Sequence, residues 1–166
     1  MRSDLREIGE VAQGALDSVR GLSQSLHPSI LEELGLESTI EWYLSTFERQ
    51  SNVAVSYERT GDSVRVDDQT AIHVYRVLQE ALANVARHSG ASQAAVRLRS
   101  SAGAMHLEVE DHGRGLLLNG SRRGLGLVAM RERAALLGGT LEVVNVPEGG
   151  TRVHLTVPLK APGAAA

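Results

Sequence analysis

The segment Glu110–Leu127, which reads EDHGRGLLLNGSRRGLGL, places five glycines shortly after a lone aspartate, Asp111. Glycine loses more conformational freedom on folding than any other residue, so its repetition indicates a backbone that turns sharply or approaches another group closely. Alternating apolar residues precede this segment, and apolar residues at helical spacing follow it. The segment therefore predicts a unit of strand, glycine-rich loop and helix, around which the rest of the fold is arranged.

The rest of the chain has the same two kinds of pattern. Helices are predicted over residues 4–26, 36–47, 68–88 and 125–137, strands over 53–57, 94–99, 105–110, 140–145 and 152–159, and a connector over 29–35. Every strand after residue 90 has one apolar face only. This pattern predicts an α/β (α+β) fold, a two-layer sandwich whose mixed, mainly antiparallel sheet has helices on one face and is preceded by an N-terminal helix.

The composition excludes several kinds of function. The chain has 166 residues, of which 42% are hydrophobic and only 3% aromatic, so we expect one domain with an aliphatic core. The formal charge of −3 argues against direct binding to nucleic acid. Cysteine is absent, which excludes thiol catalysis and zinc–thiolate sites. The only lysine, Lys160, stands near the end of the chain, so a phosphate-binding loop of the Gly-x-x-x-x-Gly-Lys-Ser/Thr kind is excluded too. No apolar run is long enough to cross a membrane, and no secretory signal pattern is present.

Asp111 and the helix that begins near Gly124 form one candidate site. Asp111 ends a predicted strand, and Gly124 and Gly126 open a helix whose free N–H groups and positive dipole end favour an anion. Arg122 and Arg123 come just before that helix. The alternative is a simple turn, because Asp and Gly are common in turns.

The helix predicted over residues 68–88 contributes the second part of the candidate site. Its polar residues Glu80, Asn84, Arg87 and His88 recur at steps of three and four. Carboxylate and amide oxygens four residues apart suit a hydrated Mg²⁺ ion. A solvated helix face is the alternative, although Asn is a poor helix former. Together the two parts predict a nucleotide site, with Asp111 accepting a hydrogen bond from a purine amino group.

Four motifs resemble those of the ATP-binding catalytic domain of bacterial sensor histidine kinases, whose fold is shared by gyrase-type ATPases and Hsp90 chaperones. The resemblance covers roughly residues 25–160. The motifs resemble the N box, two glycine boxes and a last glycine box, and they are Gln79–Ala91, Asp111–Gly115, Gly124–Arg133 and Gly149–Val153. The resemblance implies that the chain binds Mg·ATP and works in two-component signal transduction.

Two further segments narrow the resemblance. Leu26–Leu36 and Met130–Arg133 resemble kinases that pair with response regulators carrying helix-turn-helix output domains. The eight residues between Gly115 and Gly124 are similar in length to the short ATP lid of that group. Such a regulator is therefore the implied protein partner.

The resemblance also implies roles for single residues. Asn84 would bind Mg²⁺ directly and Glu80 through water, Glu80, Asn84 and His88 would form the catalytic set, and Thr151 would support Asp111. The implied ATP-binding residues are Asn84, Arg87, His88, Asp111, Gly113, Gly115, Arg123, Gly124, Leu125, Gly126, Leu127 and Thr151. His112 departs from the Asn that is commoner after the aspartate.

The chain lacks the phosphoacceptor motif of these kinases. Residues 1–27 resemble only the second dimerisation helix, followed by the catalytic domain over 28–160 and a disordered tail over 161–166. The resemblance implies a catalytic fragment that phosphorylates a histidine elsewhere in a homodimeric full-length protein. This portion is expected to be cytoplasmic, and a membrane anchor is compatible with the full-length protein.

Two alternatives remain open from the sequence. One is a serine kinase of the anti-sigma-factor type, which has the same fold but not the Leu26–Leu36 linker. The other is a non-catalytic dimer module that binds nucleotide without transferring phosphate.

Overall fold

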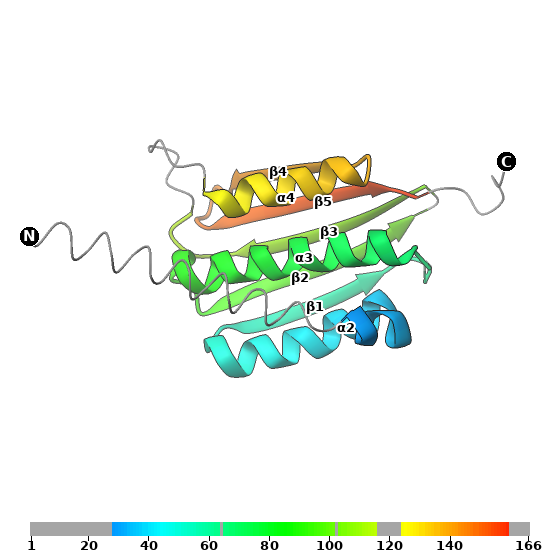
Figure 1. Cartoon of the computed structure of the whole chain (residues 1–166). Coiled ribbons are helices and arrows are strands. Elements are labelled where there is room, and N and C mark those ends of the chain that lie inside the picture. Colours follow the sequence, from blue (N-terminus) through cyan, green and yellow to red (C-terminus); the bar gives the residue numbers. More distant parts are fainter. Residues whose placement is uncertain (1–27, 64, 102, 116–123, 160–166) are drawn as a thin grey trace, which may run out of the picture.

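The chain folds into two layers, a mixed sheet and a layer of helices (Figure 1). The computed structural model describes residues 28–63, 65–101, 103–115 and 124–159. Its elements in chain order are α2 (Pro28–Ser51), β1 (Ala54–Thr60), α3 (Asp68–Asn84), the π-helix η2 (Val85–Ser89), β2 (Gln93–Ser101), β3 (Ala104–Asp111), α4 (Leu125–Leu136), β4 (Thr140–Asn145) and β5 (Thr151–Pro158). The predicted helix over 4–26 and the predicted tail over 161–166 lie outside these ranges.

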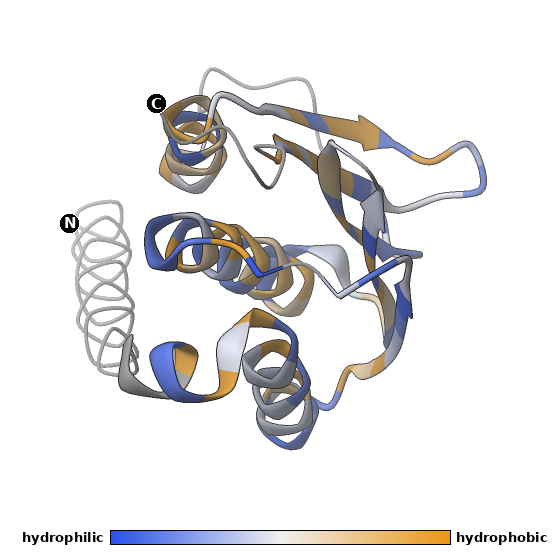
Figure 2. Ribbon diagram, turned by 90° about the vertical axis from the view of Figure 1, so that its right-hand side faces the viewer, coloured by the Kyte–Doolittle hydropathy of each residue, from blue (hydrophilic) through white to orange (hydrophobic). Residues whose placement is uncertain are grey.

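The sheet has the order β1-β2-β3-β5-β4. Only β1 and β2 pair in parallel, and α3 connects them, whereas the other neighbouring pairs are antiparallel. The predicted sandwich with a mixed, mainly antiparallel sheet is therefore confirmed. Figure 2 shows that α2, α3 and α4 all cover the same face of the sheet.

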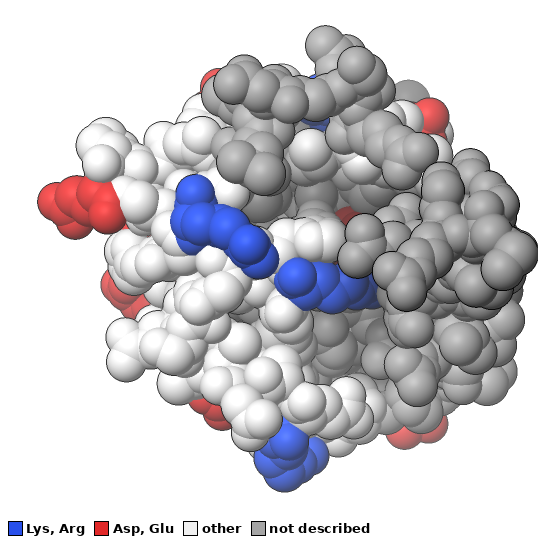
Figure 3. All heavy atoms as spheres, turned by 90° about the vertical axis from the view of Figure 1, so that its left-hand side faces the viewer, with Lys and Arg blue, Asp and Glu red and all other residues white. Residues whose placement is uncertain are grey.

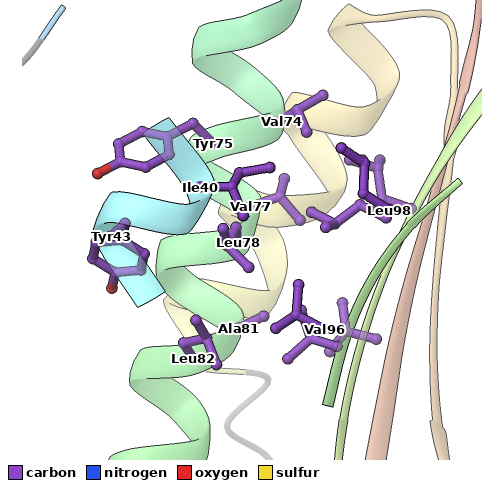
Figure 4. Close-up of a cluster of buried hydrophobic side chains, with 14 of the residues drawn as sticks. Ile40, Tyr43, Val74, Tyr75, Val77, Leu78, Ala81, Leu82, Val96 and Leu98 are labelled. Carbon is purple, nitrogen blue, oxygen red and sulfur yellow. The ribbon is translucent and has the colours of Figure 1, made fainter. Parts of the chain in front are cut away.

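The hydrophobic core lies between the sheet and α3. Alternate residues of β2 and β3 are buried, because successive side chains of a strand point to opposite faces. Tyr43 of α2 packs edge-on against Tyr75 of α3, with ring centroids 5.5 Å apart (Figure 4). The core side chains of α3 are Ala71, Val74, Tyr75, Val77, Leu78, Ala81 and Leu82. This packing fixes α3 against the strands that carry the candidate site.

The prediction of a connector over residues 29–35 is wrong, because α2 begins at Pro28. The helix is broken only at Gly35, whose φ of 78° and ψ of 173° are not helical. Glycine adopts positive φ readily, so the chain can kink there. Leu31 and Leu36 on either side of the kink are both buried, and their burial stabilises the helix before and after it. No helix in the described ranges is long and apolar enough to span a membrane.

The predicted helix over residues 68–88 is not α-helical throughout. The α-helix ends at Asn84, and the residues after it form a π turn that Gly90 closes with a φ of 68°. A π turn adds a residue to the helical repeat, so side chains after it point in other directions than α-helical spacing predicts. Such turns are frequent at functional sites, and this one lies within the candidate site.

Candidate nucleotide site

Three elements meet at the end of the molecule where α3 ends, β3 ends and α4 begins (Figure 1). The structure places Glu80 and Asn84 on α3, Arg87 and His88 on η2, and Asp111 at the last position of β3. The sequence-predicted residues that it describes thus come from segments far apart in the chain. Arg123 falls in residues 116–123, outside the described ranges.

Asn84 and Glu80 keep free oxygen atoms at this end of α3. Both side chains are half-buried, and neither makes a hydrogen bond or an ion pair with another described residue. Arg87 and His88, which follow in the π turn, are exposed. The helix therefore presents oxygen ligands and a cationic side chain next to one another.

Among the described site residues that carry a charge, Asp111 is the most buried, with 3% of its surface exposed. Its Oδ1 atom accepts a hydrogen bond from the backbone N–H of Gly113 at 2.8 Å. Oδ2 has no hydrogen-bond partner among the described residues. A carboxylate oxygen without a donor, in a residue that is otherwise buried, favours a ligand that supplies one.

Close backbone packing joins the π turn to the loop after β3. A Cβ atom on Gly113 would overlap the carbonyl oxygen of Ser89, so only glycine fits there. That same oxygen accepts a hydrogen bond from the backbone N–H of Arg114 at 2.9 Å. The Nε atom of Arg114 also donates to the carbonyl oxygen of His88 at 2.6 Å. These contacts fix the two motifs relative to each other.

Gly150, in the turn before β5, packs against the backbone of Asp111. A Cβ atom on Gly150, whose φ is +104°, would overlap the carbonyl oxygen of Asp111. Gly115, with a φ of +75°, lies near the side-chain oxygen of Asn145. Continuing the β3–β5 register by one residue places Thr151 across from Asp111, although these two residues share no hydrogen bond.

The start of α4 is open toward the same region. Gly124 is its N-cap and contributes no side-chain hydrogen bond, and a Cβ atom there would meet no atom within 4 Å. The N–H group of Leu127 donates to the carbonyl oxygen of Gly124 at 3.0 Å, whereas those of Leu125 and Gly126 have no hydrogen bond with another described residue. These first N–H groups of the helix remain available to an anion. Leu125 is 88% exposed, whereas Leu127 is half-buried against the core.

Gly126 brings the start of α4 against α3. A Cβ atom at this position would overlap Oε1 of Glu80. The carboxylate of Glu80 thus lies next to the first turn of α4, where the positive end of the helix dipole favours negative charge. The Glu80 carboxylate can occupy this position only because residue 126 is a glycine.

Sequence reasoning missed three residues that support the site. Ser89 anchors the loop through its carbonyl oxygen, Arg114 donates to His88, and Asn145 lies beside Gly115. These contacts join segments that are far apart in the chain; Arg114 and His88, for example, are 26 residues apart. No local pattern in the sequence indicates them.

The charges at this end of the molecule suit an anionic ligand. Figure 3 views this end: basic side chains stand near the middle of the face and at its lower edge, and most acidic ones lie toward its rim. Arg87 and Arg114 are exposed arginines of the motifs described above. Burial raises the pKa of the nearby Tyr43 phenol well above its usual range, with smaller contributions from Tyr75 and Glu80, so this hydroxyl stays neutral.

The donor set fits Mg²⁺ rather than a metal held by protein ligands alone. The described ranges contain no group of three or more His, Cys, Asp or Glu side chains placed to hold a metal. Mg²⁺ commonly takes one or two protein oxygens and completes its shell with water and phosphate. Asn84 and Glu80 can supply such oxygens, directly or through water.

Comparison with known proteins agrees with this geometry. Residues 69–161 match the family described as "Histidine kinase-, DNA gyrase B-, and HSP90-like ATPase". "Sensor histidine kinase MctS" of Rhizobium johnstonii is 37% identical over 92% of this chain and 34% of its own length. "Oxygen sensor histidine kinase NreB" of Staphylococcus carnosus is 34% identical over 93% of this chain and 45% of its own length. The chain thus spans less than half the length of these curated relatives.

Solved structures give the same result for the fold. The histidine kinase domain of a blue-light activated histidine kinase from Erythrobacter litoralis superposes with a TM-score of 0.61 at 26% identity, covering 75% of this chain and 61% of that one. Acinetobacter baumannii histidine kinase AdeS superposes with a TM-score of 0.65 at 20% identity, over 89% of this chain and 83% of that one. The chain therefore belongs to the histidine kinase-, DNA gyrase B- and HSP90-like ATPase family, as an ATP-binding domain of the sensor histidine kinase kind.

Proposed function

We propose that this chain binds Mg·ATP and transfers the γ-phosphate to a histidine elsewhere in a full-length sensor kinase. The observation that carries this proposal is the buried residue Asp111, whose Oδ2 accepts a hydrogen bond from no described residue, at the end of the molecule where α4 begins without a side-chain cap. The family match and the sensor histidine kinase relatives support it.

Asp111 recognises the adenine in this proposal. Its Oδ1 atom is already held by Gly113, which fixes the carboxylate and leaves Oδ2 to accept a hydrogen bond from the adenine amino group. Burial strengthens this hydrogen bond, since water competes for it less. Gly113 and Gly115 keep the space beside the carboxylate free of side chains.

The triphosphate lies between α3 and the start of α4. Asn84 holds Mg²⁺, with Glu80 acting through water, and the metal neutralises charge on the phosphate oxygens when it is bound. The start of α4 at Gly124–Leu127, together with Arg87, His88 and Arg123, binds the phosphates. Thr151 stands across from Asp111 and supports it through its hydroxyl or a water molecule.

Phosphoryl transfer depends mainly on positioning and charge neutralisation, which such a site supplies without a nucleophile of its own. The bond between the γ-phosphorus and the bridging oxygen breaks, a bond from phosphorus to an imidazole nitrogen forms, and ADP leaves. In this proposal Glu80 and His88 assist the loss of the proton from the imidazole.

The wider role of the chain is inferred from its resemblance to sensor histidine kinases. We infer a cytoplasmic catalytic portion of a homodimeric two-component kinase, in which residues 1–27 form the second dimerisation helix and 28–160 the ATP-binding domain. The partner is a response regulator with a helix-turn-helix output domain. The resemblance of Leu26–Leu36 and Met130–Arg133 to that group supports this choice.

Transfer can be tested by mixing the chain with labelled ATP, Mg²⁺ and a polypeptide that carries the phosphoacceptor helix of the same kinase. We expect a label that is lost in acid and kept in alkali, as a phosphohistidine is. Acid-stable label on serine of a small partner would instead identify a serine kinase. Nucleotide binding without any label on the acceptor would identify a passive binding module.

A further inference from the structure

A cavity of about 510 Å³ opens on the face of the sheet that the helices leave uncovered. Side chains of three neighbouring strands and the end of β1 line it, and those that matter here are Arg97, Arg99, His106, Glu108 and His154. Its volume is in the range of cavities that hold small molecules. Nothing in the proposed kinase chemistry uses it.

The cavity is separate from the nucleotide site. His106 and Asp111 both lie on β3, five residues apart, which corresponds to about 16 Å along a strand. Their side chains also point to opposite faces, because odd-numbered residues of β3 face the helices and even-numbered ones face away. A ligand in this cavity therefore cannot share contacts with one at Asp111.

Arg99 is the unpaired cation of the cavity. Its side chain is exposed and makes no hydrogen bond or ion pair with any residue that the structure describes. Arg97, one row along the same strand, is paired instead, because its Nη1 atom lies 2.6 Å from Oε1 of Glu108. Arg97 also lies 3.9 Å from carboxylate oxygens of Glu58 and Glu110. Neighbouring carboxylates therefore offset its charge, and Arg99 carries the positive charge that a ligand can reach.

The two imidazoles add hydrogen-bonding groups that are only partly used. The rings of His106 and His154 stack with centroids 5.4 Å apart and planes 25° apart. Nδ1 of His106 lies 3.2 Å from Oγ1 of Thr156, while the ring nitrogens of His154 have no partner in the described ranges. A neutral imidazole carries one N–H donor, so His154, one row along the sheet from Arg99, has a donor that no described residue uses.

Strand register explains why these groups meet. Arg99, His106 and Thr156 lie opposite one another across β2, β3 and β5. In the next row on the same face, Glu108 lies opposite Arg97 and His154. Since residues two apart share a face, the sheet itself holds these side chains in place.

The geometry points to a binding site for a small oxyanion, either a carboxylate or a phosphate. Arg99 supplies the charge and His154 a hydrogen-bond donor. Guanidinium groups suit both kinds of oxyanion, because their planar donors match two oxygens at once. Arg97 stays bound to Glu108 and shapes the wall of the cavity.

The site can be tested by titrating inorganic phosphate, and separately citrate, into the 166-residue chain at constant ionic strength while recording amide chemical shifts. We expect saturable shifts at Arg99, His106 and His154, and a stronger response to one anion identifies the ligand class. Arg99→Gln should weaken binding about tenfold or more, since charged hydrogen bonds are involved. Arg49→Gln, which removes the same charge from α2, should leave binding unchanged.

Two results would overturn the proposal. One is the absence of saturable shifts at the cavity with both anions in the folded wild-type chain. The other is equal binding in wild type and Arg99→Gln, or equal weakening by Arg49→Gln, because either would show that the net charge of the chain and not this cavity attracts the anion. Shifts at Asp111 report on the nucleotide site and so do not affect this result.

Discussion

The carboxylate of Glu80 lies against the backbone of Gly126, so closely that a Cβ atom on Gly126 would overlap Oε1 of Glu80. Through this contact the polar face of α3 and the first turn of α4 form one surface. The position of the carboxylate depends on the absence of a side chain at residue 126. This pair gives a direct way to separate the geometry of the site from the stability of the fold.

Gly126→Ala should lower phosphotransfer with little effect on stability. The new methyl group displaces the flexible end of Glu80, and displacements near 1 Å at a reacting centre reduce rates by about tenfold to a hundredfold. Alanine favours a helix over glycine by about 1 kcal/mol, which offsets the crowding. Initial rates of phosphotransfer and denaturant unfolding measure the two effects.

Leu136→Ala is the control, because Leu136 is exposed near the other end of α4 and lies outside the candidate site. It should keep a phosphotransfer rate close to that of the wild type. Equal losses of phosphotransfer rate in the two variants would mean that the contact between residue 126 and Glu80 does not determine this rate.

Gly150→Ala should destabilise the fold strongly. The residue has a φ of +104°, and its Cβ atom would overlap the backbone carbonyl of Asp111, which cannot move aside cheaply. Strain from the left-handed conformation plus this overlap should lower the free energy of unfolding by more than about 2 kcal/mol. Gly90→Ala has a similarly positive φ of +68° in open space, so it should lose only about 1 kcal/mol. Similar losses from both variants in urea unfolding would contradict the predicted overlap.

Met130→Ala should remove part of the core. Met130 on α4 is fully buried, whereas Leu136 on the same helix is 72% exposed. Truncating a buried methionine destabilises a protein by about 2–5 kcal/mol, while a change at an exposed position away from such features stays within about 0.5 kcal/mol. Thermal unfolding of Met130→Ala and Leu136→Ala measures this difference, and losses of equal size would argue against the described packing of α4.

Asp67→Ala should destabilise α3 at neutral pH only. Asp67 is the N-cap of α3, and hydrogen bonds from Thr70 to its carboxylate lower its pKa. A lowered pKa means that the carboxylate stabilises the fold above its usual pKa of 3.8, and that this contribution is lost as pH falls through the folded-state value. The variant should lose about 1 kcal/mol at pH 7, with the difference from wild type shrinking toward pH 2.

Asp62→Ala, in the exposed turn after β1, serves as the control for Asp67→Ala. It should show little destabilisation at either pH. A loss at Asp67 that stays the same between pH 7 and pH 2 would mean that the ionised cap is not its cause.

The sequence predicts the layers of this fold well, because alternation in strands and helical spacing both follow from burial. The paired strands β2 and β3 and the helix α3 were all expected from such patterns. The sequence does not reveal that α3 changes to a π turn after Asn84, because the apolar spacing before that residue is regular. Nor does it reveal that residues before Gly35 are helical, since their burial depends on contacts made elsewhere in the chain.

The candidate site was predicted in part for the same reasons. Glu80, Asn84 and Asp111 could be chosen from spacing and from the resemblance, and the structure places them at one end of the molecule. Contacts such as that of Gly126 with Glu80 depend on how two helices pack and leave no local pattern. The roles of these residues stay predictions until nucleotide binding is measured.

Nucleotide binding by Asp111 is the central claim, and calorimetric titration of ADP and a non-hydrolysable ATP analogue, with and without Mg²⁺, tests it most directly. Wild type and Asp62→Asn, which removes one negative charge from an exposed loop, should bind both nucleotides with Mg²⁺-dependent affinity. Asp111→Asn should remain folded but bind at least about a hundredfold more weakly, because a buried charged hydrogen bond is lost. Equal binding by Asp111→Asn, or no binding by the folded wild type, would contradict the account.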